Sequence, residues 1–175
     1  AVVMASRSIA VGDSEVIVAG GVESMTRAPW VIGKPDKAFP RTSETMHSST
    51  LGWRFVNPKM KAQYGVDPMG ETAENLADLH QISRADQDLF AMRSQQKATA
   101  ARASGRFAKE IIAVEVQQKK ETKLISEDEF IKPQTSLEGL SNLKPAFRKE
   151  GTVTAGNASG LNDGAAALLF ASEEA

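Results

Sequence analysis

At the N-terminus, the apolar residues change from a helical to a strand-like pattern. Residues 1–11 are typical of a helix, and Gly12 suits its C-terminus because glycine readily adopts a positive φ angle. Residues 14–19 end in four apolar side chains, three of them β-branched, which predicts a strand covered on both faces. Gly20 and Gly21 are expected to end that strand. A helix followed by a buried strand is half of a β-α-β unit.

The next part of the sequence is irregular and then helical. Residues 25–68 show little periodicity and are rich in Pro, Gly, Ser and Thr, as expected of a functional loop, an interface or a disordered stretch. Residues 71–80 then predict a helix. Its side chains at helical spacing are Ala73, Leu76, Ala77 and His80.

A second, longer helix is expected directly afterwards. Ser83 and Asp86 have the spacing of a capping box, which places the start of the helix at Ser83. The helix is predicted to reach about Ser104, with Gly105 ending it. Its inward-facing stripe is predicted to be Leu89, Met92, Gln96 and Ala100, with Phe90 beside it.

The last third of the sequence predicts strands. Residues 111–118 alternate between apolar and polar side chains, which indicates a half-exposed strand with Ile112, Val114 and Val116 on one face. The highly charged residues 119–132 are expected to form a solvated hairpin or loop, and residues 165–171 a buried strand. Since neither terminal strand has a predicted partner, we expect the 175 residues to be a segment of a longer protein.

Composition narrows the possible functions. Lys and Arg number 21 against 22 Asp and Glu, so no basic excess exists for general nucleic-acid binding. Cysteine is absent and only two histidines occur, which excludes a cysteine nucleophile within these residues and predicts no metal site. No apolar run approaches the ~20 residues of a membrane helix. The first residues also lack the basic start and apolar stretch of a secretory signal, so we expect a cytoplasmic protein.

Residues 152–170 are the best candidate for a catalytic or ligand-binding segment. They contain no Lys, Arg or Glu, and Gly156, Gly160 and Gly164 recur every four residues. Such glycines let another backbone or a ligand approach closely. Polar groups for a tight corner come from Asn157, Ser159, Asn162 and Asp163. The pattern favours a compact turn that packs a helix onto a sheet, and a ligand-binding surface is the alternative; the two are compatible.

Neither histidine is a good candidate for a catalytic residue, and the common catalytic sequence motifs do not occur. His47 lies in a polar loop and is expected to be solvated, whereas His80 lies near the apolar stripe of its helix and is expected to be a packing residue. No G-x-S-x-G, P-loop or G-x-G-x-x-G pattern occurs.

Several longer motifs resemble the thiolase family over essentially the whole chain. The sequence contains GGVESM at 20–25, MGETAEN at 69–75, LKPAF at 143–147 and GTVTAGNASGLNDGA at 151–165, in the family's order. The stretches TLGWRFVNP at 50–58 and KAQYG at 61–65 look more like the 3-oxoadipyl-CoA (β-ketoadipyl-CoA) branch than the acetoacetyl-CoA branch.

The resemblance implies an α/β fold. Thiolases have two similar halves, each with a five-stranded mixed sheet, and a mostly helical loop domain inserted in the first half. By resemblance, residues 1–24 would hold the end of the nucleophile helix and the fourth strand, residues 25–150 the loop domain, and residues 151–175 the glycine-rich segment and fifth strand.

The resemblance also implies an activity. In thiolases a cysteine at a helix N-terminus attacks the 3-oxo group, releases acetyl-CoA and holds the acyl chain as a thioester until coenzyme A takes it. That cysteine, the second cysteine, and the histidine and asparagine of the oxyanion sites have no counterpart in these 175 residues. No catalytic role is therefore carried over, and we expect this chain alone to be inactive.

Coenzyme A binding does carry over, with no prosthetic group. By resemblance, Ser159 would hydrogen-bond the pantetheine arm, and backbone groups of Ala155 and Gly156 would line its path. The other implied contacts are an apolar wall from Ala146 and Phe147, Met69 at the thiol end, and Lys132 near the adenosine phosphate. Lys132 stands where bacterial relatives often have arginine. A lysine keeps the positive charge but lacks the guanidinium fork.

The resemblance leaves alternatives. Pro68 stands where several acetoacetyl-CoA thiolases have histidine, which agrees with a different acyl chain. The alternatives to 3-oxoadipyl-CoA cleavage are acetoacetyl-CoA thiolase activity and a non-catalytic acyl-CoA-binding or assembly module. By resemblance, the complete protein would be a homotetramer.

Overall fold

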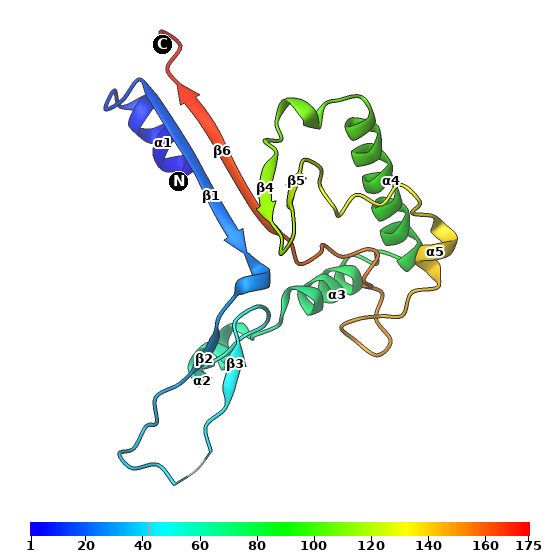
Figure 1. The fold of residues 1–175 in the computed structure, drawn as a ribbon. Helices are drawn as coiled ribbons and strands as arrows, with labels where there is room; N and C mark the ends of the chain where they lie inside the picture. The colour runs from blue at the N-terminus through cyan, green and yellow to red at the C-terminus, as the bar shows by residue number, and fades with distance from the viewer. Residues whose placement is uncertain (42) are drawn as a thin grey trace. The chain divides into compact units, whose positions relative to one another are not determined.

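The computed structural model describes residues 1–41 and 43–175; residue 42, inside the irregular stretch 25–68, lies outside the described residues. The chain forms two compact units (Figure 1). The first consists of Ala1–Gly65 and Leu161–Ala175, and the second of Val66–Gly160. The division into residues 1–24, 25–150 and 151–175 stays a prediction.

The first unit begins with the expected helix, α1 (Val2–Ala10). Gly12 follows it with a φ angle of 78°. The N–H of Asp13 donates to the carbonyl oxygen of Ser8 at 2.9 Å, and that of Gly12 to Ile9 at 3.0 Å. These two bonds form the Schellman motif that a glycine after a helix predicts.

The two terminal strands, for which the sequence predicts no partner, pair with each other: β1 (Val16–Ser24) is antiparallel to β6 (Asp163–Ala171) along its whole length. The prediction that Gly20 and Gly21 end the strand is wrong, because both lie within β1. At Gly20 a side chain would collide with the carbonyl oxygen of Ala166 on β6. The role of Gly20 is therefore to let the two strands approach closely, and it does not form a turn.

The predicted burial of both terminal strands is also wrong for this chain. Val18 on β1 is 69% exposed and Leu169 on β6 is 70% exposed. Helix α1 lies against the β1–β6 ribbon, where Ala5 and Ala19 are buried (Figure 1). A two-stranded ribbon with one helix beside it leaves most of its side chains in solvent, whatever their hydrophobicity.

The irregular stretch contains more structure than its sequence predicts. It forms η1 (Met25–Arg27), the antiparallel pair β2 (Trp30–Ile32) and β3 (Met46–Ser48), and helix α2 (Pro58–Tyr64). Helix α2 begins after Asn57, whose side-chain oxygen accepts from the N–H of Lys59 at 2.9 Å. An asparagine cap followed by proline is a helix-start signal that the periodicity analysis missed.

In the second unit both predicted helices are confirmed as α3 (Met69–Leu79) and α4 (Arg84–Ala103). The Ser83 hydroxyl accepts from the N–H of Asp86 at 3.1 Å and donates to its carboxylate at 2.7 Å. Gly105 follows α4 with a φ angle of 72°. The capping residues therefore set both ends of α4, as predicted.

The predicted inward stripe of α4 is only partly right. Leu89 and Met92 are half-buried, but Gln96 and Ala100 are exposed. The buried residue of this helix is Asp88, which is 3% exposed. Apolar spacing does not reveal this face, because an aspartate is expected on the solvent side of a helix.

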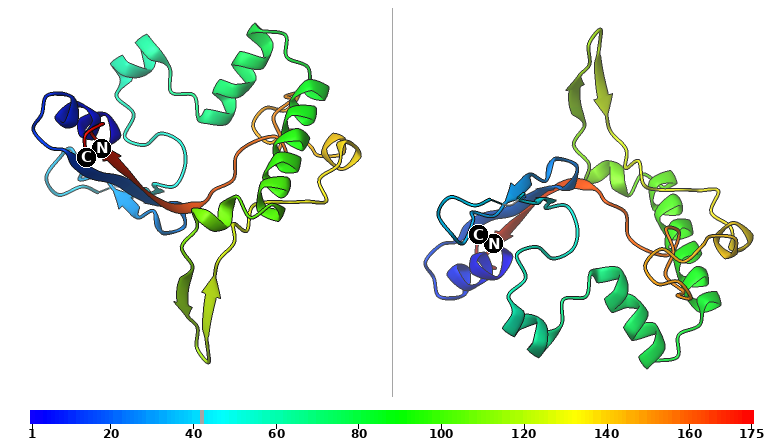
Figure 2. Two further views of the ribbon diagram at one scale, coloured as in Figure 1. Left: turned by 90° about the horizontal axis from the view of Figure 1, so that it is seen from above. Right: turned by 90° about the horizontal axis from the view of Figure 1, so that it is seen from below.

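The rest of the unit is η2 (Phe107–Lys109), the hairpin β4 (Val114–Gln117) and β5 (Thr122–Ile125), and α5 (Leu137–Ser141). The hairpin or loop expected within residues 119–132 is a hairpin that begins earlier, at β4, and Figure 2 shows it projecting beyond α4. The prediction that β4 is half-exposed is wrong, since all of its residues are exposed. A projecting pair of strands buries neither face.

The interior of the second unit mixes apolar and polar side chains. The buried apolar residues are Ala77, Leu140 and Val153, and the buried polar residues are Glu74, Asp88 and Thr154. Buried charges need partners, so the contacts of these polar groups determine how residues 151–157 are held.

Candidate functional site

The sequence-predicted coenzyme A residues all lie in the second unit; they are Met69, Lys132, Ala146, Phe147, Ala155, Gly156 and Ser159. They come from the start of α3, from the segments on either side of α5, and from the glycine-rich segment. The structure arranges them in two groups.

The first group is formed around Phe147. Its ring lies against Gly70, where a Cβ atom would overlap the ring, so Phe147 lies next to the first turn of α3 that begins at Met69. The N–H of Ala146 donates to the carbonyl oxygen of Val153 at 2.9 Å. Pro145 pairs with Thr154 in an isolated antiparallel bridge. These contacts bring Met69, Ala146, Phe147, Ala155 and Gly156 into one region.

The second group contains Lys132 and Ser159. The Lys132 ammonium lies 5.1 Å from the centroid of the Phe130 ring. The same ring packs against Gly160, where a Cβ atom would overlap it. The backbone N–H of Lys132 also donates to the side chain of Gln95 at 2.8 Å. Lys132 and Ser159 are thus connected through Phe130 and Gly160.

Most of these residues face solvent. Met69 is 83% exposed and Phe147 is 46% exposed. Ala146, Ala155 and Ser159 are exposed too, and Gly156 is half-buried. Two large apolar side chains at the surface beside exposed backbone groups form a surface that a ligand with both apolar and amide groups could cover.

Glu74 of α3 was missed by the sequence analysis. It is 1% exposed, and its carboxylate accepts from the N–H groups of Thr152 at 2.9 Å and Val153 at 2.8 Å and from the Thr152 hydroxyl at 3.0 Å. At Gly151 a Cβ atom would overlap the carboxylate. Glu74 precedes Ala77 by three residues on the predicted inner face of the helix, which is the signal that could have identified it.

The charge state of Glu74 follows from these contacts. Burial by itself raises the pKa of the carboxyl group, but the N–H groups of Thr152 and Val153, the Thr152 hydroxyl and the charge of Arg148 lower it. The lowering contributions are larger in sum, so the pKa of Glu74 lies below its ordinary value. A charged Glu74 therefore holds the start of the glycine-rich segment.

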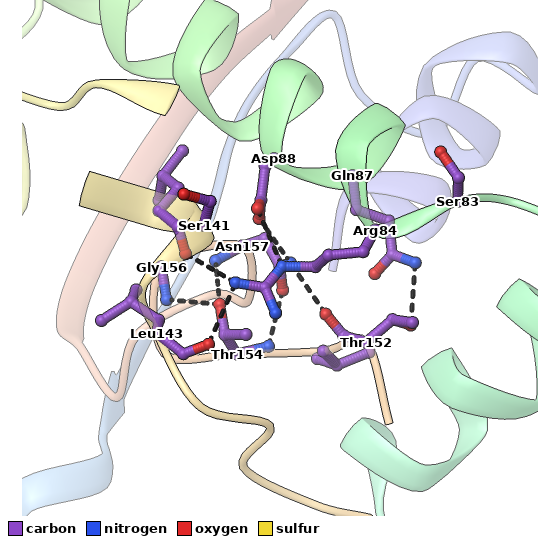
Figure 3. A network of polar contacts seen from close by, with 12 residues as sticks. Ser83, Arg84, Gln87, Asp88, Ser141, Leu143, Thr152, Thr154, Gly156 and Asn157 are labelled. Carbon is purple, nitrogen blue, oxygen red and sulfur yellow. Dashed lines mark hydrogen bonds and ion pairs between the residues drawn. The ribbon is translucent and has the colours of Figure 1, made fainter. Parts of the chain in front are cut away.

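A second buried carboxylate, Asp88 of α4, holds the same segment (Figure 3). One of its oxygens accepts from Arg84 Nε at 2.8 Å and the other from Asn157 Nδ2 at 2.9 Å. Arg84 also donates through Nη2 to the carbonyl oxygens of Leu140 at 2.6 Å and Leu143 at 3.1 Å. We refer to Arg84, Asp88 and Asn157 as the Asp88 cluster.

Asn157 closes a tight turn over residues 152–157, which we call the 152–157 turn. Its side-chain oxygen accepts from the N–H of Thr154 at 2.7 Å, and its Nδ2 also donates to the carbonyl oxygen of Thr152 at 3.1 Å. At Gly156 a Cβ atom would lie 2.5 Å from the side chains of Leu140 and Leu143. The predicted compact turn is confirmed, although it packs against α3, α4 and α5 instead of joining a helix to a sheet.

Arg148, directly after Phe147, is held by acidic and amide side chains of α3. It donates to Glu71 at 2.8 Å, to Asp78 at 2.6 Å and to Asn75 at 2.6 Å. Its hydrogen bond to Glu71, together with the nearby negative charges, raises the pKa of Arg148 above its ordinary value in spite of desolvation. The position of Phe147 is thereby fixed relative to α3 on two sides.

Asp163, expected at the polar corner, belongs to the first unit instead. Its carboxylate accepts from the Thr26 hydroxyl at 2.5 Å and from the Thr26 N–H at 3.0 Å. These hydrogen bonds lower the pKa of Asp163, and they join η1 to the start of β6. Asp163 therefore anchors a strand end and lies outside the 152–157 turn.

Both histidine predictions are wrong. His47 lies in β3, half-buried, with its ring 5.5 Å from that of Phe55 in an edge-to-face arrangement, so it is not simply solvated. His80 is exposed at the C-terminal end of α3 and is no packing residue, because the inner face of α3 passes through Glu74 and Ala77.

Residues 1–41 and 43–175 hold neither a candidate metal site nor a helix that could cross a membrane. Among residues 1–41 and 43–175, no group of three or more Asp, Glu or His side chains could hold a metal ion. In the same residues, none of the helices combines the length and hydrophobicity needed to span a bilayer.

The sequence profile described as "Thiolase, N-terminal domain" matches residues 1–174. "Beta-ketoadipyl-CoA thiolase" of Pseudomonas putida is 57% identical over 171 residues, covering 98% of this chain and 42% of that protein. "3-oxoadipyl-CoA/3-oxo-5,6-dehydrosuberyl-CoA thiolase" of Escherichia coli K12 is 55% identical, covering 97% of this chain and 42% of that protein. The chain thus spans less than half the length of these relatives.

Solved structures give the same result for the fold. Human mitochondrial 3-ketoacyl-CoA thiolase matches with a TM-score of 0.85 and 40% identity, covering 99% of this chain and 42% of that one. Its complex with CoA matches with a TM-score of 0.82, 40% identity and the same coverage. The Bacillus anthracis acetyl-CoA acetyltransferase matches with a TM-score of 0.84 and 36% identity, covering 99% and 43%. The predicted resemblance and the thiolase-like α/β fold are confirmed.

Proposed function

This chain belongs to the thiolase family, and from that membership we propose that it forms part of an enzyme that cleaves 3-oxoadipyl-CoA with coenzyme A into succinyl-CoA and acetyl-CoA. The observation that carries this proposal is the 55–57% identity to two relatives whose names specify β-ketoadipyl-CoA or 3-oxoadipyl-CoA. The solved structures with broader or acetyl-CoA names are 36–40% identical.

The proposed reaction follows the thiolase scheme. A cysteine thiolate attacks the C3 carbonyl carbon, the C2–C3 bond breaks, and its electron pair leaves with acetyl-CoA, which takes a proton from a second cysteine. The succinyl group stays on the first cysteine as a thioester, and the thiolate of coenzyme A then attacks it and releases succinyl-CoA. Because the 175 residues contain no cysteine, both reacting groups would come from other parts of the complete protein.

For this chain we propose the role of holding coenzyme A. Ser159 would hydrogen-bond the pantetheine arm, and the backbone of Ala155 and Gly156 would line its path. Ala146 and Phe147 would supply the apolar wall, Met69 would border the thiol end, and Lys132 would pair with the adenosine phosphate. The proximity of Met69, Ala146, Phe147, Ala155 and Gly156 and the exposure of Met69 and Phe147 support this role.

The test compares acyl substrates in the complete protein. We expect kcat/KM for 3-oxoadipyl-CoA to exceed that for acetoacetyl-CoA by at least about tenfold, which corresponds to ~1.4 kcal/mol of differential transition-state binding. A preference for acetoacetyl-CoA would instead assign the protein to acetyl-CoA acetyltransferase activity. The 175-residue polypeptide alone should show no thiolysis, and any thiolysis by it would contradict the proposed source of the cysteines.

The exposed apolar side chains of Met69 and Phe147 also fit one further candidate, a non-catalytic module that binds acyl-CoA or supports assembly. This candidate predicts that calorimetry detects coenzyme A binding to the complete protein while no acyl-CoA is cleaved.

We also propose, from family membership, that the complete protein is a cytoplasmic homotetramer and that residues 25–150 form its loop domain. Light scattering of the purified protein would test the tetramer.

A further inference from the structure

The Asp88 cluster lies between the two segments that carry most of the proposed coenzyme A residues (Figure 3). We infer that Asp88 is a positioning residue for coenzyme A binding, acting through Asn157 on Ala155 and Gly156 and through Arg84 on the segment that leads to Ala146. This inference rests on the proposed function, because it assumes that these segments hold coenzyme A.

Asp88 has a fixed geometry. Its side chain is 4% exposed, and each carboxylate oxygen has a different partner, Arg84 at 2.8 Å and Asn157 at 2.9 Å. A buried charge is tolerated only with such partners, so Asp88 holds both groups in defined directions.

The Asn157 amide has one favourable orientation. Its Nδ2 faces two acceptors, the Asp88 carboxylate and the Thr152 carbonyl oxygen, and its oxygen faces a donor, the Thr154 N–H. Exchanging the amide oxygen and nitrogen would place a donor against a donor and an acceptor against a carboxylate. Asp88, together with the backbone of Thr152 and Thr154, therefore selects the one orientation of Asn157 that closes the 152–157 turn.

Arg84 holds the other wall of the proposed site, the segment after α5 that leads to Ala146. Arg84 donates to the carbonyl oxygens of Leu140, in the last turn of α5, and of Leu143, two residues beyond that helix. The carbonyl oxygen of Leu140 also accepts from the N–H of Leu143 at 3.0 Å, so Arg84 holds the segment that leaves α5 together with this turn. Leu143 is three residues before Ala146, and the side chains of Leu140 and Leu143 pack around Gly156. One buried carboxylate thus fixes both walls relative to α4.

The residues that would touch coenzyme A depend on this anchoring. Ala155 and Ser159 are exposed and lie outside regular helices and strands, so their own packing does not define their positions. Apolar residues of similar volume could give the protein the same free energy of unfolding as a buried ion pair. They could not replace the directional contacts that set the backbone groups of the 152–157 turn.

The test varies coenzyme A at saturating 3-oxoadipyl-CoA in the complete protein. Asn157→Asp removes the amide donor and places a second carboxylate against that of Asp88. We expect KM for coenzyme A to rise about tenfold or more with kcat within about twofold of the wild type. The double variant D88N/N157D restores a donor–acceptor pair between positions 88 and 157 but not the hydrogen bond to the Thr152 carbonyl oxygen. KM should therefore fall at least about threefold below that of Asn157→Asp without reaching the wild-type value.

A milder variant and a control complete the design. Arg84→Lys keeps the charge near Asp88 but loses the fork that reaches Leu140 and Leu143, so KM for coenzyme A should again rise while kcat holds. The control, Arg106→Gln, removes the exposed ion pair with Glu110 and should leave both constants unchanged.

The outcomes separate the two proposals. If the wild-type protein cleaves no 3-oxoacyl-CoA, the proposed function is wrong. If it is active and both Asn157→Asp and Arg84→Lys leave KM for coenzyme A unchanged, the positioning role is wrong. That role is equally contradicted if activity falls only with the folded fraction, measured by thermal melting, and D88N/N157D restores nothing.

Discussion

Replacing Glu74 tests how the buried carboxylate holds the glycine-rich segment. In Glu74→Gln one oxygen still accepts from the N–H groups of Thr152 and Val153, and the new amide group can donate to the Thr152 hydroxyl. Two things are lost: the charge, and the second oxygen that accepts from the Thr152 N–H at 2.9 Å. The remaining hydrogen bonds change from charge-assisted to neutral, and we expect a cost of about 1–2 kcal/mol. In Glu74→Ala the buried N–H groups lose their acceptor, which costs about 2–5 kcal/mol.

Hydrogen exchange at the amides of Thr152 and Val153 measures this effect locally. For Glu74→Gln we expect about tenfold faster exchange in the complete protein, since 1.4 kcal/mol is a factor of ten, and about 100-fold or more for Glu74→Ala. The exposed Glu129→Gln is the matched control and should change neither amide. Equal protection in wild type and Glu74→Ala would refute the assigned role.

The pH dependence gives a second check of the same contact. The pKa of Glu74 is lowered in the folded protein, so its stabilisation is complete above the ordinary carboxyl pKa and is lost as pH falls through the folded value. The difference in protection between wild type and Glu74→Gln should therefore be constant near neutral pH and shrink below about pH 4. A difference that persists unchanged in acid would show that the carboxylate charge is not responsible.

Three further substitutions have expected outcomes. Gly156→Ala introduces a methyl group against Leu140 and Leu143, so KM for coenzyme A should rise several-fold in steady-state assays; an unchanged KM would contradict the tight packing. Lys132→Gln should raise KM for coenzyme A but not for dephospho-coenzyme A, and equal effects on both would remove Lys132 from the phosphate. Asp163→Asn should lower the melting temperature at pH 7, and the difference from the wild type should shrink as pH falls below the ordinary aspartate pKa, because the pKa of Asp163 is lowered in the folded protein; a difference that stays constant in acid would contradict this.

Local chemistry explains which parts of the fold the sequence predicts. Gly12, Ser83 and Gly105 mark helix ends through their own backbone or hydroxyl groups, and the structure has the helix ends there. Helix α2 was missed because its seven residues are too short to show a period, although Asn57 caps it. The sequence predicts β1 as buried, but its residues are mostly exposed. An apolar sequence shows that a strand favours burial, whereas its actual burial depends on which helices and strands pack against it.

The candidate site shows the same limit. Its motifs predict the binding residues by resemblance, but the side chains that hold them were missed. Glu74 reaches Thr152 across 78 positions and Asp88 reaches Asn157 across 69 positions, so no local pattern joins them. Analysis of apolar spacing also places acidic side chains in solvent by default, although both are buried here.

The fit between Gly151 and Glu74 has an evolutionary consequence. Any side chain at position 151 would occupy the space of the Glu74 carboxylate. A shorter residue at position 74 would leave the N–H groups of Thr152 and Val153 without their acceptor. Neither position can drift alone without loss, so across homologous proteins the two should either stay unchanged or be replaced together.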